Sequence, residues 1–392
     1  MKKEKVLIVH NYYKIPGGED TVVENEKKIL EANGHDVKLY SRNNRELDSM
    51  GIFKKLLMPF FTIFNIKTYI DVKRIIKKES IDIIHVHNTL NIISPSVYYA
   101  ALKCKVPVVQ TVHNFRLLCP AATFYRNGHV CEECVNKGLN SSIKYSCYRN
   151  NRIYTLACVL TLKIHRFIGI YKRINYICLT DFNKEKLIML DKFIDKKRVY
   201  IKQNFVIENS ICHINKERKN QFVFAGRLDS IKGIDILLKA WRNVNCNVGD
   251  LVICGTGPML EWCNDFIKVN KLENVKMLGF VENNLVRKII SESKALILPT
   301  QWYEGFPMAI VEAYSGGTPV IGSDIGNTGS LIINNLTGMK FKANSIDELT
   351  SIINSFDKVK DELKVFDFYR KNYSYNENYN IMKKIYTECL NK

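Results

Sequence analysis

The regular alternation of short strand-like segments with longer segments of helical periodicity is the feature that most constrains the fold of this chain. In the N-terminal half, the strand-like segments are Val6–Val9, Asp36–Tyr40, Ile81–Val86 and Val106–Val112. Val22–Glu31 has a helical pattern that stops at Asn33-Gly34, a common end of a helix. Short strands that alternate with helices predict a parallel β-sheet with helices on its faces.

The C-terminal half repeats this alternation after a polar linker at residues 204–220. Its strand-like segments are Phe222–Ala225, Leu251–Cys254, Val275–Leu278, Ala295–Leu298 and Pro319–Ile321. A chain of 392 residues is also long for a single hydrophobic core. We therefore predict an α/β fold of two Rossmann-like, doubly wound domains, 1–203 and 204–372.

The final segment, 373–392, predicts an amphipathic helix over Tyr373–Leu390. Ile381, Ile385 and Cys389 would share its apolar face. We expect this helix to return to the N-terminal domain.

Positive charge is concentrated in the N-terminal half. Residues 1–200 contain 34 Lys and Arg against 18 Asp and Glu, a net of +16, whereas residues 201–392 contain 24 against 21, a net of +3. This asymmetry indicates an anionic partner: nucleic acid, an anionic membrane surface or a phosphorylated substrate. The alternative is a general surplus of surface lysine that only keeps the protein in solution.

The sequence shows no export signal and no membrane-spanning segment. Val6–Val9 is too short for the apolar core of a signal peptide, and no apolar run approaches the roughly 20 residues that span a bilayer. We expect a cytoplasmic or peripheral protein, in which the twelve cysteines are thiols or metal ligands.

Two glycine-containing turns directly follow predicted strands, where open parallel sheets bind their ligands. Gly17-Gly18 lies at the turn into the first helix, where backbone N–H groups can approach an anion. The segment from Gly226-Arg227 to Lys232 places a guanidinium and an ammonium group around one turn. Two such cations could bracket a diphosphate.

A third loop follows the strand at Ala295–Leu298 and contains Glu304 and Glu312. Pro307 is expected at the first position of a helix, so the free N–H groups there would hold phosphate or a sugar hydroxyl. Carboxylates are suitable acceptors for the vicinal hydroxyls of ribose or hexose. The sequence therefore predicts a site for phosphate or for sugar hydroxyls in the C-terminal half.

These three segments, in this order and at these separations, resemble the retaining GT-B glycosyltransferases of family 4. Two further segments extend the resemblance over nearly the whole chain: Gly255-Thr256-Gly257-Pro258 and Leu278-Gly279-Phe280-Val281. The resemblance implies two Rossmann-like domains that face a central cleft. The N-terminal domain would bind the acceptor, and the C-terminal domain would bind a nucleotide-sugar donor, a UDP- or GDP-sugar.

The resemblance also implies roles for individual residues. Arg227 and Lys232 would contact the donor diphosphate, Glu312 would bind the ribose hydroxyls, and Gly17 and Gly18 would close over the diphosphate from the opposite domain. The remaining donor-site positions are Glu304, Gly305 and Phe306 at the hexose, Phe280 and Val281 beside the base, and Gly255 and Gly257 in the glycine-containing loop.

His113, at the end of Val106–Val112, matches the family's active-site histidine near the donor sugar. Its imidazole could hydrogen-bond a sugar hydroxyl or stabilise developing charge. No carboxylate closely follows this strand, so we expect a same-face, ion-pair-like substitution rather than a covalent double displacement. The sequence has no Asp-x-Asp segment, so we expect no catalytic metal. His85 and His87 are expected to be core or supporting residues.

Four cysteines follow His113 in one basic region: Cys119, Cys131, Cys134 and Cys147. A C-x2-C pair with two flanking cysteines is typical of a closed structural zinc site. Four unrelated thiols are the alternative. The sequence thus predicts a structural zinc ion, separate from the catalytic chemistry.

Two segments combine apolar and basic residues in the pattern of an interfacial membrane anchor. Phe53–Phe64 is followed by Lys67, Lys73, Arg74, Lys77 and Lys78, and Arg152–Arg173 is a second such stretch. Core-facing helices with basic outer faces are the alternative. A membrane-docked enzyme suggests a lipid-linked glycan acceptor, such as a polyisoprenyl diphosphate, as used in bacterial surface polysaccharide assembly.

Two other functions remain open at this point. A nucleic-acid-binding protein, or a sugar transferase that acts on DNA, would use the basic half for phosphates, although no standard binding motif is present. A nucleotide-sugar epimerase would need no separate acceptor. The sequence favours a retaining glycosyltransferase over both.

Overall fold

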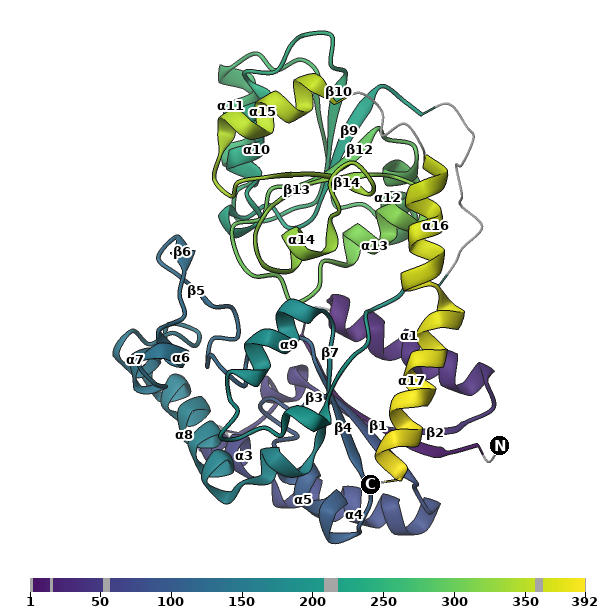
Figure 1. Ribbon diagram of the computed structural model, residues 1–392. Helices are drawn as coiled ribbons and strands as arrows, with labels where there is room; N and C mark the ends of the chain where they lie inside the picture. Colours follow the sequence, from purple (N-terminus) through teal and green to yellow (C-terminus); the bar gives the residue numbers. More distant parts are fainter. Residues whose placement is uncertain (1–2, 15–16, 52–56, 208–217, 357–361, 392) are drawn as a thin grey trace. The chain divides into compact units, whose positions relative to one another are not determined.

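The computed structural model describes residues 3–14, 17–51, 57–207, 218–356 and 362–391. The chain divides into two compact units (Figure 1). Unit 1 contains Met1–Phe124, Cys131–Gln203 and Asn378–Lys392, and unit 2 contains Tyr125–Val130 and Asn204–Glu377. Each unit contains a six-stranded sheet. No described helix combines the length and the apolar character needed to cross a membrane.

The sheet of unit 1 is entirely parallel and has the order β2-β1-β3-β4-β7-β8. Its strands are β1 (Lys5–Tyr12), β2 (Asp36–Asn43), β3 (Ile83–Asn88), β4 (Val108–Val112), β7 (Asn175–Cys178) and β8 (Val199–Ile201). Val6 of β1 pairs with Val37 of β2 and with Ile83 of β3. The order reverses between β1 and β3, which is where a ligand is expected in such a sheet.

The helices of unit 1 follow the predicted alternation. They are α1 (Gly18–Ala32), α3 (Met58–Ile63), α4 (Ile66–Glu79), α5 (Ser96–Lys103), α6 (Glu133–Asn136), α7 (Asn140–Lys144), α8 (Arg152–Ile168) and α9 (Asp181–Ile188). A short hairpin, β5 (Tyr125–Arg126) and β6 (His129–Val130), belongs to unit 2. Of the predicted anchor segment Phe53–Phe64, residues 53–56 lie outside the described residues.

Unit 2 has the strand order β11-β10-β9-β12-β13-β14, which is the order of a classical Rossmann sheet. The strands are β9 (Gln221–Ala225), β10 (Asp250–Cys254), β11 (Val275–Gly279), β12 (Ala295–Leu298), β13 (Val320–Ser323) and β14 (Gly338–Phe341). The helices are α10 (Ile234–Trp241), α11 (Leu260–Val269), α12 (Asn283–Ser291), α13 (Met308–Ser315), α14 (Gly326–Leu331), α15 (Ile346–Ser355) and α16 (Glu362–Tyr373). The order reverses between β9 and β12.

The prediction of two doubly wound α/β units is confirmed, and all nine predicted strands are present. Five strands were not predicted: β5, β6, β7, β8 and β14, which have only two to four residues each. Such short strands carry too little periodicity to be distinguished from loops. Of the predicted linker at 204–220, residues 208–217 lie outside the described residues.

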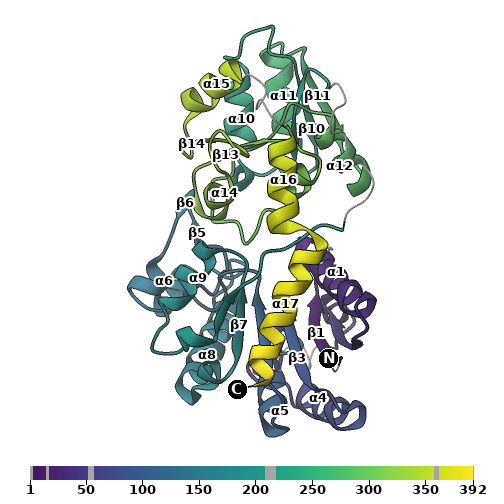
Figure 2. The ribbon, with the colours of Figure 1, turned by 45° about the vertical axis from the view of Figure 1, so that its right-hand side comes forward.

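The last helix, α17 (Tyr375–Leu390), packs on the sheet of unit 1 through its C-terminal part (Figure 2). Ile385 and Cys389 are buried, as the amphipathic pattern predicts, whereas Ile381 is half-buried. The Tyr386 hydroxyl lies 2.7 Å from Nδ1 of His85 on β3. The helix therefore joins the core of unit 1 through a polar contact as well as through its apolar face.

Candidate functional site

In unit 2, the loops after β9, β10 and β12 meet beyond the carboxyl ends of these strands. The Gly226 N–H donates to Cys254 O at 3.0 Å, and the Gln301 N–H donates to Ile231 O at 2.9 Å. Because β9 and β12 are the strands at which the sheet order reverses, this loop cluster lies where a Rossmann sheet binds a nucleotide.

Glycines allow these loops to approach one another closely. Gly233 has φ +73°, and a Cβ atom there would lie 1.8 Å from Pro299 O. A Cβ atom on Gly255 would lie 1.8 Å from Gly226 O, and one on Gly257 would lie 2.3 Å from Leu228 O. Both distances exclude any side chain without a backbone shift. Gly255 and Gly257 thus have a clear packing role in the predicted donor loop.

The predicted phosphate and sugar ligands lie in these loops. Lys232 Nζ lies 2.7 Å from Glu304 Oε1, and the Thr300 hydroxyl lies 3.2 Å from the same oxygen. Asn327 Nδ2 donates to the carbonyl oxygens of Glu304 and Gly305, at 2.6 and 2.7 Å. These contacts orient the backbone around Gly305 and bring Lys232 and Glu304 together.

Arg227 is more exposed, at 58% of its side chain, and pairs with Asp229 at 2.8 Å. Phe306 is buried, whereas Phe280 is 75% exposed directly after β11, and Val281 is half-buried. An exposed aromatic ring at the end of a strand is suitable for contact with a base. Pro307 is the N-cap of α13 rather than its first residue, because the helix begins at Met308.

Glu312 lies on α13, one turn beyond the start of the helix. Burial raises the pKa of its carboxyl, and the nearby Arg287 together with a hydrogen bond from Asn283 partly lowers it. Arg287 and Asn283 belong to α12, so the carboxylate faces the helix that follows β11 and Phe280. A carboxylate that exchanges these polar contacts for ribose hydroxyls would keep its hydrogen bonds on binding.

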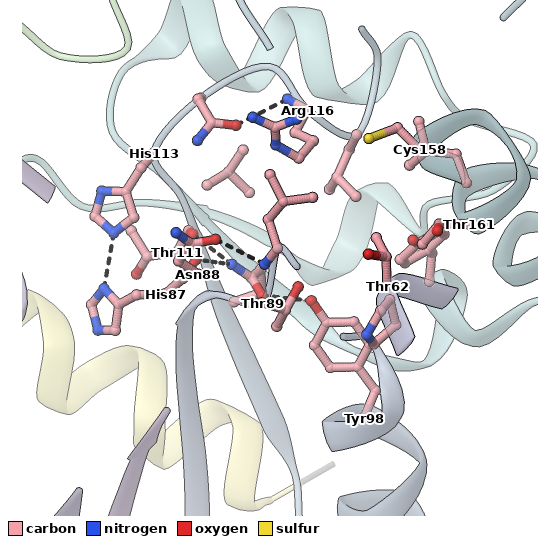
Figure 3. Close-up of a pocket in the computed structure, with 18 residues that line it drawn as sticks. Thr62, His87, Asn88, Thr89, Tyr98, Thr111, His113, Arg116, Cys158 and Thr161 are labelled. Atoms are coloured by element: carbon pink, nitrogen blue, oxygen red, sulfur yellow. Dashed lines mark hydrogen bonds between the residues drawn. The ribbon is translucent and has the colours of Figure 1, made fainter. Parts of the chain in front are cut away.

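In unit 1, His113 follows β4 and lines a cavity of about 90 Å³ (Figure 3). Its Nε2 lies 2.9 Å from Nδ1 of His87. Burial and the neighbouring His10 and Lys202 lower the pKa of His113 well below its usual range. His113 is therefore neutral near pH 7. Asn88, Thr111 and Arg116 line the same cavity, and none of its lining residues is an Asp or a Glu.

A buried polar cluster lies behind His113, and the sequence analysis missed most of it. Glu26 Oε1 lies 2.6 Å from Lys202 Nζ, and Glu26 Oε2 lies 3.4 Å from Nε2 of His87 and 3.5 Å from Nδ1 of His85. Lys202 also donates to Asn378 of α17 at 3.1 Å. His85 and His87 are thus supporting residues, as expected. The alternation of His85 and His87 along one strand was a sequence signal for this cluster. No local pattern in the sequence indicates that Lys202 belongs to it.

Glu26, His85 and His87 form the one group of three possible metal ligands found among the described residues. The Lys202 ammonium already binds the carboxylate, and a cation there opposes a second cation. The group is better described as an ion pair with stacked imidazoles, since the His85 and His87 rings lie 4.4 Å apart.

The Gly17-Gly18 turn begins α1. The Gly17 N–H donates to Asp20 at 3.0 Å, and the other Asp20 oxygen lies 2.7 Å from Nε2 of His10. This contact ties the start of α1 to β1 and leaves the turn exposed. The expected closure of Gly17 and Gly18 over a donor in the other domain stays a prediction.

The structure brings three of the four predicted zinc ligands near one another. The Cys119 thiol forms a hydrogen bond with Cys134 and accepts bonds from the backbone of residues 121, 123 and 124, which lower its pKa to about 6. Cys134 is also close enough to Cys147 to interact electrostatically. None of the four is in a disulfide, and their sulfur atoms are not within 4.8 Å of one another as a group in the described structure. The thiol environment of Cys119 fits a metal ligand, and the zinc site stays a prediction.

Two glycosyltransferase family models match the chain. Residues 208–372 match the model of glycosyl transferases group 1, and residues 16–130 match glycosyltransferase family 4. The Escherichia coli UDP-Gal:alpha-D-GlcNAc-diphosphoundecaprenol alpha-1,3-galactosyltransferase is 28% identical over 329 residues, which cover 79% of this chain and 74% of that protein. A protein of the cps region of Klebsiella pneumoniae is 23% identical, with 89% of both chains covered.

Solved structures show the GT-B fold. A glycosyltransferase of Rickettsia africae aligns with a TM-score of 0.70 at 18% identity, covering 100% of this chain and 99% of that one. Anabaena HepE in complex with UDP aligns with a TM-score of 0.66 at 14% identity, covering 98% and 100%. Since the two family models together match residues 16–130 and 208–372, the chain belongs to the family 4, group 1 glycosyltransferases.

Proposed function

We propose that this enzyme transfers a hexose from a UDP-sugar, with retention of anomeric configuration, to a lipid-linked glycan in bacterial surface polysaccharide assembly. The observation that carries the proposal is the loop cluster of unit 2. There, Lys232, Glu304 and Glu312 lie beyond β9 and β12, at the reversal point of a Rossmann sheet. UDP in the HepE structure supports uracil over guanine as the donor base.

In this proposal, Arg227 and Lys232 bind the diphosphate of the donor. Each already contacts a carboxylate, Asp229 or Glu304, so donor binding would exchange one anionic partner for another. Glu304 is then released to accept hydrogen bonds from the hexose, next to the backbone amides of Gly305 and Phe306. Glu312 would bind the ribose, and Phe280 and Val281 would border the base.

The reaction breaks the bond between the anomeric carbon and the diphosphate oxygen. It forms the new bond to the acceptor oxygen on the same face of the sugar, and the acceptor proton passes to the departing diphosphate. A covalent intermediate would need a carboxylate at the acceptor side. The carboxylates of Asp20 and Glu26 are engaged by His10 and Lys202, and that of Glu19 accepts a hydrogen bond from Tyr13, which supports the same-face route. A neutral His113 could hydrogen-bond the reacting sugar.

Two observations support a lipid-linked acceptor. The first is the net charge of +16 in residues 1–200. The second is the name of the E. coli relative, whose acceptor is linked to diphosphoundecaprenol. Such an acceptor places the enzyme at the inner face of the plasma membrane, as a cytoplasmic, peripheral protein, and the Klebsiella relative from a cps region agrees with a role in capsule synthesis.

Thermal unfolding with UDP, GDP and ADP tests the donor site. A ligand at about 100 times its Kd stabilises the native state by roughly 2.7 kcal/mol. We expect a shift with UDP that is lost in Glu312→Gln and retained in the control Glu261→Gln, whose side chain is exposed on α11. A shift with GDP instead would reassign the base. No shift with any nucleotide would refute the donor site, and sugar interconversion without acceptor would indicate an epimerase.

A further inference from the structure

Two cavities of unit 1 adjoin one another between α3 and α8. The first is the His113 cavity, and the second has a volume of about 310 Å³. Thr62 of α3 and Cys158 of α8 line both. Figure 3 shows these two side chains on the side of the His113 cavity away from His87. The second cavity therefore adjoins the His113 cavity on the side of α3 and α8.

Two arginines flank one aromatic ring in the lining of these two cavities. The guanidinium carbon of Arg116 lies 5.1 Å from the centroid of the Tyr148 ring, and that of Arg149 lies 5.5 Å from it. Arg116 lines the His113 cavity, whereas Tyr148 and Arg149 line the second one. Two guanidinium groups near one ring form a local concentration of positive charge where the cavities adjoin.

Neither arginine has an ion-pair partner within the described parts of the chain. Glu19 is close enough to interact with Arg116, but burial raises the pKa of Glu19 to about 8, so this carboxyl is largely neutral at pH 7. Lys14 and Asp48 both line the second cavity and pair with each other. Arg116 Nη1 donates to Pro120 O at 2.8 Å. Each guanidinium group has five N–H donors, so both retain donors for an external anion, and their planar geometry suits phosphate oxygens.

Apolar side chains are exposed on the outer faces of α3 and α8. Their exposed fractions are 67% for Phe60, 66% for Ile153 and 93% for Phe167. His165 Nε2 contacts Ile63 O at 2.9 Å, so the end of α3 lies against the last turns of α8. We call these exposed side chains, together with Ile66 at the start of α4, the apolar ridge; it consists of Phe60, Ile66, Ile153, Leu160, Phe167 and Ile168.

Basic residues lie on α4, the helix that begins with Ile66. Arg74 and Lys78 are 72% and 78% exposed and pair with Asp71 and Glu79 at 4.0 and 3.6 Å, and Lys67 follows Ile66. An apolar surface beside cations is complementary to an anionic bilayer. Met58, Pro59 and Tyr154, which line the second cavity, belong to the first turns of α3 and α8.

We propose that the groove between α3 and α8 binds the diphosphate and the first isoprene units of a polyprenyl-diphosphate-linked acceptor. Arg116 and Arg149 hold the diphosphate, the sugar attached to it enters the His113 cavity, and the lipid leaves along the apolar ridge into the membrane. This inference rests on the proposed function and specifies where its acceptor binds.

Calorimetric measurement of farnesyl diphosphate binding to the full chain tests the groove. We expect farnesyl diphosphate to bind at least tenfold more tightly than either farnesol or inorganic diphosphate, because both parts of the ligand are recognised. Arg149→Gln and Tyr154→Ser should each weaken it about tenfold or more. Arg242→Gln, at an exposed arginine of unit 2, is the control and should change nothing.

Stabilisation by UDP is measured on the same preparations, which separates the two proposals. If UDP still stabilises every variant but farnesyl diphosphate binds Arg149→Gln as tightly as the unmodified protein, the groove is refuted and the donor site stands. If farnesyl diphosphate binding depends on Arg149 but UDP has no effect, the groove stands and the proposed donor is wrong.

Binding of the protein to vesicles that contain phosphatidylglycerol tests the apolar ridge. Phe167→Ser should reduce vesicle binding severalfold, whereas Val269→Ser, at a residue that is 79% exposed in unit 2, should not. Equal loss in both would refute the ridge.

Discussion

Nδ1 of His87 lies 2.9 Å from Nε2 of His113, and the two imidazole rings are stacked with their centroids 5.2 Å apart. His87 in turn lies 3.4 Å from the Glu26 carboxylate, which binds Lys202. This hydrogen bond couples the tautomers of the two imidazoles and orients His113. The nitrogen that His113 presents to the cavity is therefore chosen by residues on β3 and α1.

Replacing His87 by Ala should lower kcat with little change in KM for the donor, because the substrate contacts remain while His113 loses its orientation. The expected loss is up to about a hundredfold. His87→Asn retains a side-chain amide and should recover part of the rate, and the pH dependence of kcat should shift in both variants. His129→Asn, at an exposed histidine, is the control. A rise in KM at constant kcat would show that His87 binds substrate instead.

The ion pair between Glu26 and Lys202 is fully buried. Glu26→Gln should destabilise unit 1 by about 3–5 kcal/mol, since it leaves an uncompensated ammonium in the core. The double variant Glu26→Gln with Lys202→Met should recover most of that loss. Urea unfolding monitored by circular dichroism measures both. If the double variant is no more stable than Glu26→Gln, the ammonium is not the source of the cost.

Acid should destabilise unit 1 in a defined pH window. Burial lowers the pKa of His85 from 6.5 to about 4, so the unfolded chain binds more protons than the native state between these values. Stability is therefore complete above about pH 6.5 and falls as the pH decreases toward 4, by on the order of 3 kcal/mol for this residue. Urea unfolding from pH 8 to pH 4 measures the slope. His129→Gln should leave it unchanged, and a flat profile would contradict the burial argument.

Gly233 and Gly279 both have positive φ, +73° and +67°, but only the first faces a close neighbour. Gly279→Ala should cost about 1–2 kcal/mol, from backbone strain alone. Gly233→Ala should cost more, about 3 kcal/mol, and should weaken UDP binding, because its Cβ would overlap Pro299 O and push the β12 loop away. Equal stability and equal UDP affinity in the two variants would refute a role for this close approach.

Zinc analysis of the purified protein tests the four-cysteine site. We expect about one zinc ion per chain, lost in Cys134→Ser and retained in Cys246→Ser, whose cysteine is exposed in unit 2. Removal of zinc by a chelator should lower the unfolding temperature of unit 1 without changing UDP binding by unit 2. Absence of zinc from protein prepared without chelators would leave these residues as ordinary thiols.

Most of the sheet framework was predictable from local pattern. Val6–Val9, Phe222–Ala225 and the other predicted strands are present because a buried parallel strand needs a continuous apolar run, and this signal is local. The loops that follow these strands were predictable for the same reason, since parallel sheets bring their carboxyl ends to one edge. Lys232 and Glu304, 72 residues apart, could therefore be assigned to one site before their contact was known.

Tertiary structure alone decided which polar residues support His113 and how the acceptor side is built. Lys202 and Glu26 are 176 residues apart, and neither has a local pattern that predicts burial. Arg116 and Arg149 come together because both guanidinium groups pack on the Tyr148 ring. The sequence determined the two sheets and their ligand-binding edges, because hydrophobic periodicity is encoded residue by residue. The ion pair, the imidazole stack and the adjoining cavities depend on long-range packing, which no local pattern contains.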